Sequence, residues 1–271
     1  MSASSQLRWL LSGNPRVTLA NRRRPPGAPV QLLPRPLARG PLAHSARRIN
    51  ALLSIHAPLG RYLEIGIYEG ATLQLVDSPT RVGVDPEPRI DLTRLPKGVS
   101  VHVGTSDGYF GSLGPEAAFD LAFLDGLHHF EQTYRDLIHA FAHVPDGPLL
   151  IDDTVPSSAR SAMRDRAEAE RLAASEGSGL GPWHGDVWKV VIAIARLHPE
   201  LEFRTILGSG NPQTLVWRKA PGAAISAASA DLLEAIGRLE FEAIFEADVP
   251  QEFRPADERQ AIEAWRAAVS G

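Results

Sequence analysis

Residues 119–156, FDLAFLDGLHHFEQTYRDLIHAFAHVPDGPLLIDDTVP, decide the fold of this chain. They hold two short apolar runs, LAFL and LLI, and each run is followed by carboxylates. The residues between them predict a helix, and two buried strands joined by a helix form a parallel βαβ unit. Ligands of such sheets bind beyond the carboxyl ends of the strands. We therefore expect Asp125, Asp152 and Asp153 to lie together at one edge of a sheet.

Three carboxylates in one place are costly unless something positive lies among them, and a hard divalent cation such as Mg²⁺ meets that need. His128 follows Asp125 by three residues, in the turn after the strand. There it can take a proton from a substrate bound to the cation. A structural explanation stays open, in which Asp152 and Asp153 only cap the next helix and His128 is an ordinary loop histidine.

The size and composition of the chain limit its class. Its 271 residues suit one α/β domain with appendages, or two small domains. The lack of cysteine excludes disulfides and thiolate ligands, so any metal must be held by oxygen and imidazole. No apolar run approaches the roughly 20 residues of a membrane-spanning helix. We expect a cytoplasmic protein with no membrane partner.

The net charge of -4 hides an asymmetry along the chain. Ten arginines precede the first acidic residue, Glu64, which leaves 18 basic against 32 acidic residues and about -14 for the remainder. An acidic body argues against broad nucleic-acid binding.

The first 45 residues predict an arm outside the main domain. They contain Arg22-Arg23-Arg24, and seven prolines lie between Pro15 and Pro41. An organellar transit peptide is one reading, although the prolines break the amphipathic helix that it needs. The other is an extended arm that packs on its own body or on a second subunit. We divide the chain into the arm (1–45), a main domain (46–219) and a helical tail (220–271). The apolar face of the tail either covers the domain or pairs with a second copy of the chain, as a second possible homo-oligomer contact.

A strand, a glycine turn and a helix follow one another over residues 62–76. Such a turn brings backbone N–H groups and a helix N-terminus up to a ligand. The dinucleotide spacing G-x-G-x-x-G is absent, because Gly66 and Gly70 are four apart with Glu64 ahead of them. Asp85 ends the next strand at the distance where a carboxylate can bind ribose hydroxyls. A plain packing turn and a turn aspartate are the alternative explanations.

Later segments add weaker signals. Residues 104–107, after a third strand, carry small polar groups that suit an adenine edge or an ordinary turn. Residues 157–176 predict an exposed helix, and Asp186 is a plausible N-cap of the helix after it. Trp183 and His184 are candidates for the pocket wall, although such a tryptophan is more often core. Two strands, 201–207 and 214–218, predict a hairpin at the sheet edge.

Together these features resemble the class I S-adenosylmethionine-dependent methyltransferases over roughly residues 59–219. Residues 64–70 are similar to the first motif of that family, Asp85 to its ribose-binding acid, and residues 104–107 to its adenine edge. The resemblance implies an α/β fold with a doubly wound, seven-stranded, mostly parallel sheet, an antiparallel last strand and C-terminal helices. It implies these cofactor-binding residues: Glu64, Gly66, Gly70, Asp85, Ser106 and Asp107.

Within that superfamily, residues 125–128 and 151–153 look like the metal-dependent O-methyltransferases. The catechol and caffeoyl-coenzyme A types have a lysine where this chain has His128 and an asparagine where it has Asp153. The macrolide-sugar O-methyltransferases match better, with a histidine as proposed base and two consecutive acids. This resemblance implies S-adenosylmethionine and Mg²⁺ as cofactors, Asp125, Asp152 and Asp153 as metal ligands, and His128 as base. The implied acceptor is a hydroxyl of a small molecule with vicinal oxygens, such as a sugar or a natural product.

Three other functions stay open. The nearest is a methyltransferase of the same fold that uses no metal, in which the acids after the second run are structural. A nicotinamide-dependent oxidoreductase is opposed by the missing third glycine of its fingerprint. A non-catalytic protein would use the tail helices to bind a partner.

Overall fold

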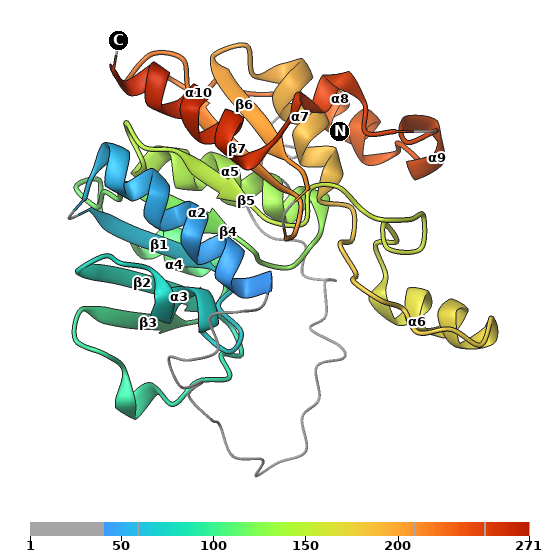
Figure 1. Cartoon of the computed structure of the whole chain (residues 1–271), viewed down its shortest axis with the longest axis horizontal. Helices are drawn as coiled ribbons and strands as arrows, with labels where there is room; N and C mark the ends of the chain where they lie inside the picture. The colour runs from blue at the N-terminus through green and yellow to red at the C-terminus, as the bar shows by residue number, and fades with distance from the viewer. Residues whose placement is uncertain (1–40, 59, 209, 247, 271) are drawn as a thin grey trace.

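The computed structural model describes residues 41–58, 60–208, 210–246 and 248–270, and within them eight strands form a single sheet. The strands are β1 (Arg61–Ile65), β2 (Thr80–Asp85), β3 (Val99–Val103), β4 (Leu121–Leu124), β5 (Leu149–Ile151), β6 (Leu201–Ile206), β7 (Gln213–Arg218) and β8 (Pro255–Ala256). Their order in the sheet is β3-β2-β1-β4-β5-β7-β6-β8 (Figure 1).

The pairing of the strands confirms a doubly wound, mostly parallel sheet. Strands β1 to β5 run parallel to one another, whereas β7 runs antiparallel to both β5 and β6. The sheet has one strand more than the seven expected, because β8 pairs with the end of β6. This added strand has two residues and begins with Pro255 at the sheet edge, where a missing N–H costs no ladder bond.

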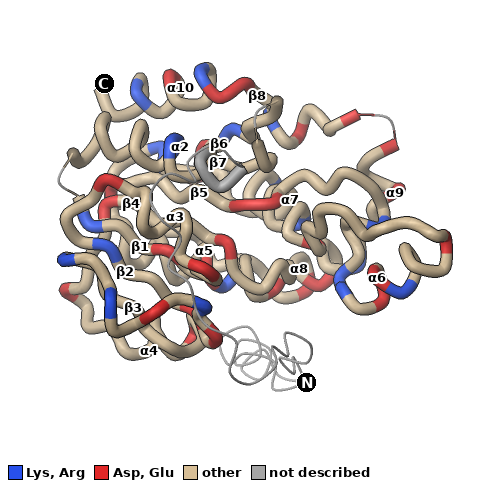
Figure 2. The backbone as a smooth tube through the Cα atoms, turned by 60° about the horizontal axis from the view of Figure 1, so that its bottom comes forward, with Lys and Arg blue, Asp and Glu red and all other residues tan. Residues whose placement is uncertain are grey.

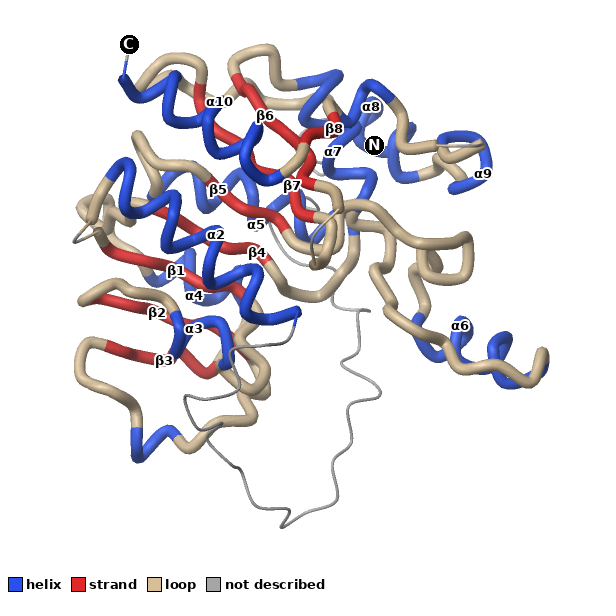
Figure 3. Tube along the Cα trace, viewed as in Figure 1, coloured by secondary structure: helices blue, strands red, loops and turns tan. Residues whose placement is uncertain are grey.

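Helices cover both faces of the sheet (Figure 3). The helices of the described residues are α2 (Pro41–His56), α3 (Ala71–Leu75), α4 (Ser106–Ser112), α5 (Phe130–His143), α6 (Arg166–Ser175), α7 (Trp188–Leu197), α8 (Ala230–Gly237), α9 (Phe241–Ile244) and α10 (Glu258–Ser270), of which α6 projects away from the sheet (Figure 3). Two short 3₁₀ turns are η2 (Leu92–Arg94) and η3 (Gln251–Phe253).

The alternation of side chains along β4 divides the core into two layers. Leu121 and Phe123 pack with buried residues of α2, α3 and α10. Ala122 and Leu124 pack with those of α4, α5, α7 and α8. Every residue of β4 is buried, because helices lie on both sides of a central parallel strand.

Three local expectations change. Helix α2 begins at Pro41, inside the predicted arm, and the first 40 residues of that arm lie outside the described chain. The helix expected over residues 157–176 is limited to α6, which begins after its N-cap Asp165. Asp186 does not cap α7, whose N-cap is Val187; its carboxylate instead accepts a hydrogen bond from the backbone N–H of Phe130, the first residue of α5, at 2.7 Å.

The C-terminal helix α10 carries charges of both signs (Figure 2). Basic and acidic residues alternate along α10 in Figure 2. None of the helices within the described ranges has both the length and the apolar run needed to cross a bilayer.

Candidate active site

The carboxyl ends of β1, β4 and β5 lie side by side. The N–H of Asp125 donates to the carbonyl of Ile65 at 2.8 Å, and that of Asp152 donates to Leu124 at 3.0 Å. The parallel ladder therefore continues one residue beyond β4 and β5. As a result, the structure brings the predicted carboxylates of both loops to one edge of the sheet.

A histidine and two carboxylates meet at this edge. His128 Nε2 lies 3.1 Å from Asp125 Oδ1, and His128 Nδ1 lies 3.4 Å from Asp153 Oδ2. One ligand atom from each of the three residues lies within 4.8 Å of the other two. We call these three residues the rim cluster. Both ring nitrogens of His128 face carboxylate oxygens, so the cluster gathers negative charge around one imidazole.

The backbone of the rim cluster is strained. His128 and Asp153 have φ angles of 60° and 55°, in the left-handed region that residues with a side chain rarely adopt. Such conformations persist where the surrounding structure enforces them, at about 1–3 kcal/mol each. At Gly185, a Cβ would lie 2.0 Å from the carbonyl oxygen of His128, so only glycine lets that segment approach so closely. The packing thus holds the histidine in place.

Residues 183–185 form a wall beside the rim cluster. The Trp183 ring stacks on the His128 ring, with centroids 5.3 Å apart and 13° between the planes. The Trp183 carbonyl oxygen is 3.3 Å from His128 Nδ1, and the indole N–H donates to the carbonyl of Met163 at 2.7 Å. His184 Nε2 lies 3.5 Å from Asp153 Oδ1. Both predicted wall residues therefore contact the rim cluster.

Burial perturbs the ionisable groups of the site. It raises the pKa of Asp153 well above the usual carboxyl range, and the nearby charge of Asp152 adds to the effect. Burial also raises the pKa of Asp152 and lowers that of the His184 imidazole to about 4. Asp153 Oδ1 is buried and accepts no hydrogen bond from the described residues. An ionised carboxylate in this position needs a positive neighbour.

A divalent cation fits these residues. The donors are carboxylate oxygens and imidazole nitrogens, which is the set that a chain without cysteine can offer. A cation here would offset the repulsion between Asp125 and Asp153 and give Asp153 Oδ1 a partner. A protonated His128 between the two carboxylates would offset part of the same repulsion.

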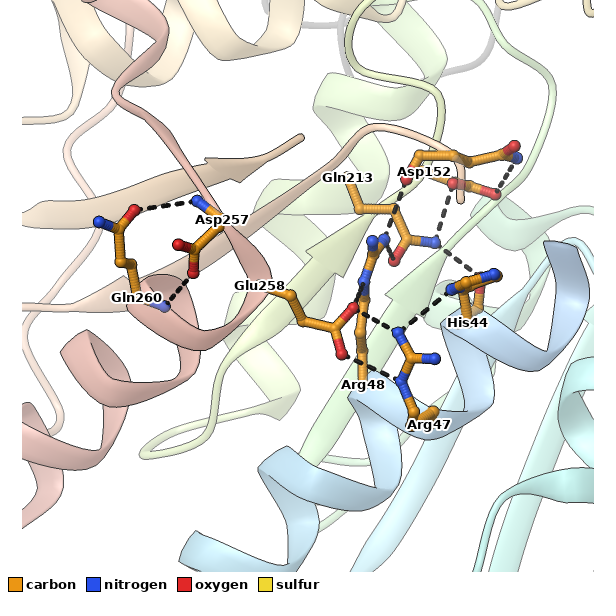
Figure 4. A network of polar contacts seen from close by, with 10 residues as sticks. His44, Arg47, Arg48, Asp152, Gln213, Asp257, Glu258 and Gln260 are labelled. Carbon is orange, nitrogen blue, oxygen red and sulfur yellow. Dashed lines mark hydrogen bonds and ion pairs between the residues drawn. The ribbon is translucent and has the colours of Figure 1, made fainter. Parts of the chain in front are cut away.

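Asp152 belongs to a separate polar network (Figure 4). Gln213 Nε2 donates to Asp152 Oδ1 at 2.9 Å, and Asn211 Nδ2 lies 3.5 Å from Oδ2. Behind them, the buried Arg48 of α2 donates to Gln213 Oε1 at 2.7 Å and pairs with Glu258 of α10 at 3.0 Å. Sequence reasoning missed these partners because no local pattern marks contacts between α2, β7 and α10.

Glu64 and the glycine turn lie at the end of β1. Glu64 is buried and accepts a hydrogen bond from the Tyr62 hydroxyl at 2.7 Å, and burial raises its pKa well above the usual value. At Gly66, where φ is 86°, a Cβ would lie 1.9 Å from the carbonyl oxygen of Asp125. Gly70 also has a positive φ and is the N-cap of α3. The close packing of Gly66 against Asp125 is by itself enough to require glycine at this position.

Asp85 at the end of β2 binds the backbone of two neighbouring turns. Its oxygens accept hydrogen bonds from the N–H groups of Tyr68 and Glu87, each at 2.8 Å. This is the geometry of a turn aspartate, and each carboxylate oxygen has a second lone pair.

Ser106 and Asp107 begin α4 and contact α5. Gln132 donates to the Ser106 hydroxyl at 3.0 Å, and Arg135 donates to both oxygens of Asp107 at 3.2 and 3.1 Å. The polar residues predicted for the adenine edge thus join two helices.

A family model for a methyltransferase domain matches residues 63–154, from β1 to the loop after β5. A Klebsiella pneumoniae protein assigned as an O-methyltransferase is 17% identical, with a TM-score of 0.46, and the alignment covers 68% of this chain and 93% of that one. A calicheamicin amino pentose methyltransferase from Micromonospora echinaspora, solved with S-adenosylmethionine, is 19% identical, with a TM-score of 0.35 and coverage of 42% and 51%. Thermotoga maritima spermidine synthase is 11% identical, with a TM-score of 0.42 and coverage of 78% and 74%. No curated protein matches the chain.

The family match and the sheet agree over the middle of the chain. Residues 63–154 hold the glycine turn, Asp85 and the rim cluster within the segment that matches the methyltransferase domain. The sheet around them is parallel up to its antiparallel β7. The family match therefore assigns a methyltransferase domain to residues 63–154, and the sheet around it has the Rossmann-like fold of such domains.

Proposed function

We propose that this protein is an S-adenosylmethionine-dependent methyltransferase, that it transfers a methyl group to a hydroxyl of a small molecule with vicinal oxygens, and that a divalent cation assists the reaction. The convergence of Asp125, His128 and Asp153 carries the proposal, since one ligand atom from each lies within 4.8 Å of the others. The buried Asp153 Oδ1, which accepts no hydrogen bond in the described chain, supports it.

Asp125 and Asp153 would hold the cation, with Asp152 beside them at the end of β5. When bound, Mg²⁺ lowers the pKa of an acceptor hydroxyl and fixes its position. S-Adenosylmethionine supplies the methyl group, and we propose that the β1 and β2 residues Glu64, Gly66, Gly70 and Asp85 bind it, together with Ser106 and Asp107.

His128 would act as the base. The Trp183 carbonyl and Asp153 Oδ2 both lie near Nδ1, and because both only accept hydrogen bonds, they favour a ring that carries its proton there. Nε2 then carries the lone pair that would take the proton of the acceptor hydroxyl. Once Nε2 is protonated, Asp125 Oδ1 at 3.1 Å can hold it by a charge-assisted hydrogen bond. The stacked Trp183 ring would keep the imidazole plane fixed during this step.

A methyltransferase without a metal is the second candidate. The hydrogen bond of Asp152 with Gln213 favours it, because this oxygen already has a strong partner inside the protein. In that case a protonated His128 would balance Asp125 and Asp153, and Asp125 would only orient the acceptor.

Calorimetric titration and turnover on a panel of catechols and vicinal-diol sugars separate the two candidates. We expect S-adenosylhomocysteine to bind with or without Mg²⁺, and we expect turnover to stop with a strong chelator and to return with added Mg²⁺. Asp125→Ala should abolish the Mg²⁺-dependent turnover and leave cofactor affinity near normal. The matched control is Glu170→Gln on the exposed α6, which should leave both unchanged. Full turnover in the presence of the chelator, on any acceptor of the panel, would contradict the proposal that a metal ion assists the reaction.

A further inference from the structure

His184 is a buried imidazole directed at the unpartnered oxygen of the rim cluster. Only 4% of the residue is exposed, and its Nε2 lies 3.5 Å from Asp153 Oδ1. Asp153 Oδ1 accepts no hydrogen bond from any residue that the structure describes. The two atoms therefore face each other without forming a hydrogen bond.

The other side of the His184 ring is anchored. Nδ1 forms a short hydrogen bond with the hydroxyl of Ser161, which is itself buried. The backbone N–H groups of His184 and Gly185 both donate to the carbonyl of Ser161, each at 3.0 Å. The ring is thus held from its backbone and from Nδ1, and its direction toward Asp153 is fixed by residues outside the rim cluster.

The hydrogen-bond roles of the two nitrogens decide what Nε2 can do. A neutral imidazole carries one N–H and one lone pair. If Nδ1–H donates to the Ser161 hydroxyl, the Nε2 lone pair points toward Asp153 Oδ1. Two lone pairs that face each other repel unless a positive group lies between them. Histidines that bind metals commonly show this arrangement, with the second ring N–H donated to a neighbouring oxygen.

The separation of the two donor atoms suits adjacent ligands of one ion. Donor atoms about 2.1 Å from an ion and 3.5 Å from each other subtend roughly 110° at the ion. The 3.4 Å between His128 Nδ1 and Asp153 Oδ2 shows that the neighbouring atoms of the cluster have a similar spacing.

We propose that His184 Nε2 is a ligand of the divalent cation, next to Asp153 Oδ1, and that Ser161 positions its ring. This inference rests on the cation of the proposed function and specifies it further. Imidazole nitrogen suits first-row transition ions, whereas Mg²⁺ prefers oxygen and retains its water ligands. The site should therefore bind Mn²⁺ more tightly than Mg²⁺.

Mn²⁺ binding to the chelator-treated full chain tests the inference without any methyl acceptor. We expect calorimetry to show at least tenfold tighter binding of Mn²⁺ than of Mg²⁺. Pulsed electron paramagnetic resonance should detect the nitrogen of a coordinated imidazole. His184→Ala should lose that nitrogen signal and weaken Mn²⁺ binding about 10- to 100-fold, with Mg²⁺ binding changed less. Ser161→Ala should weaken Mn²⁺ binding by a smaller factor, and His128→Ala should keep the nitrogen signal.

His143→Gln is the matched control, because His143 lies in the last turn of α5, at the opposite end of the helix from the rim. It should keep the wild-type affinity and signal. S-Adenosylhomocysteine binding checks that each variant is folded, and if His184→Ala does not fold, the wild-type spectrum and Ser161→Ala decide.

Three results would overturn the inference. The first is a nitrogen signal that survives in His184→Ala and disappears in His128→Ala. The second is Mn²⁺ binding that shows no nitrogen signal and is abolished in Asp153→Ala. This result would support the proposed cation site and show that His184 is not one of its ligands. The third is a protein that binds S-adenosylhomocysteine and neither ion, which would also remove the cation from the proposed function.

Discussion

The two halves of the candidate site differ in how their polar groups are satisfied. At the ends of β1 to β3, Asp85 and Asp107 already accept hydrogen bonds from backbone N–H groups or from an arginine. At the ends of β4 and β5, Asp153 has a buried oxygen without a hydrogen bond in the described chain, and carboxylates lie close together. Internal partners stabilise the first half by themselves. A ligand would stabilise the second half more than the first. Substitutions that stabilise the ligand-free second half should therefore lower its activity.

Gly66→Ala should have the largest effect, because Gly66 joins the two halves. The added Cβ would lie 1.9 Å from the carbonyl of Asp125, and φ is 86°, so the loop after β4 must move. We expect a loss of roughly 2–4 kcal/mol in unfolding free energy, with weaker binding of both cofactor and cation. Denaturant unfolding measures the loss. Gly111→Ala is the control, since a Cβ there meets nothing within 4 Å.

The pair Asp153→Asn and Asp85→Asn tests the contrast directly. Asp153→Asn removes a buried carboxylate whose pKa burial raises, so the metal-free protein should melt at a higher temperature while turnover falls by about 100-fold or more. Asp85→Asn should instead lower stability by roughly 1–3 kcal/mol, because its carboxylate accepts two backbone hydrogen bonds. Thermal melting and turnover of both variants give the comparison. If both shift the melting temperature downward, the two halves do not differ as described.

Gln213→Ala tests whether the polar network around Asp152 is part of the second half of the site. This side chain joins Asp152 to Arg48 and so to α10 (Figure 4). We expect Mn²⁺ affinity to fall about tenfold and stability by roughly 1–3 kcal/mol, since buried groups of both partners lose a hydrogen bond. Gln260→Ala is the control, because Gln260 bonds only to Asp257 at the start of α10 in the described contacts. Equal losses in the two variants would place the network outside the site.

Asp136→Asn should have the smallest effect and concerns a buried carboxyl of α5, the helix that contacts Ser106 and Asp107 of the first half. Burial raises the pKa of Asp136 to about 7, from 3.8, although Gln132 donates to it. Between these two values the folded state retains a proton that the unfolded state releases, so this group lowers stability as pH rises from about 4 to 7.

The asparagine variant should therefore melt a few degrees higher than the wild type at pH 8, with a gain that shrinks toward pH 4. Melting curves over this pH range provide the measurement. A gain that does not depend on pH would show that the carboxyl is ionised throughout.

Much of the fold followed from local sequence. The apolar runs before Asp125 and Asp152 predicted β4 and β5, and the spacing of Gly66 and Asp85 predicted where β1 and β2 end. Periodicity could not predict β8, whose two residues pair with β6 only because the chain returns to that strand directly after η3. It also assigned Asp186 to the wrong helix, since a side chain that caps α5 from 56 residues away has no local signal.

The neighbourhood of Asp125, Asp152 and Asp153 could be read from the order of residues, because parallel strands end at the same edge of a sheet and each carboxylate follows its own strand. The partners of those carboxylates could not. Gln213 reaches Asp152 from β7, and Arg48 of α2 contacts Gln213 behind it, while His184 reaches Asp153 from the segment before α7. Hydrogen bonding and burial depend on distances between segments far apart in the chain, and these distances exist only once the layers have packed.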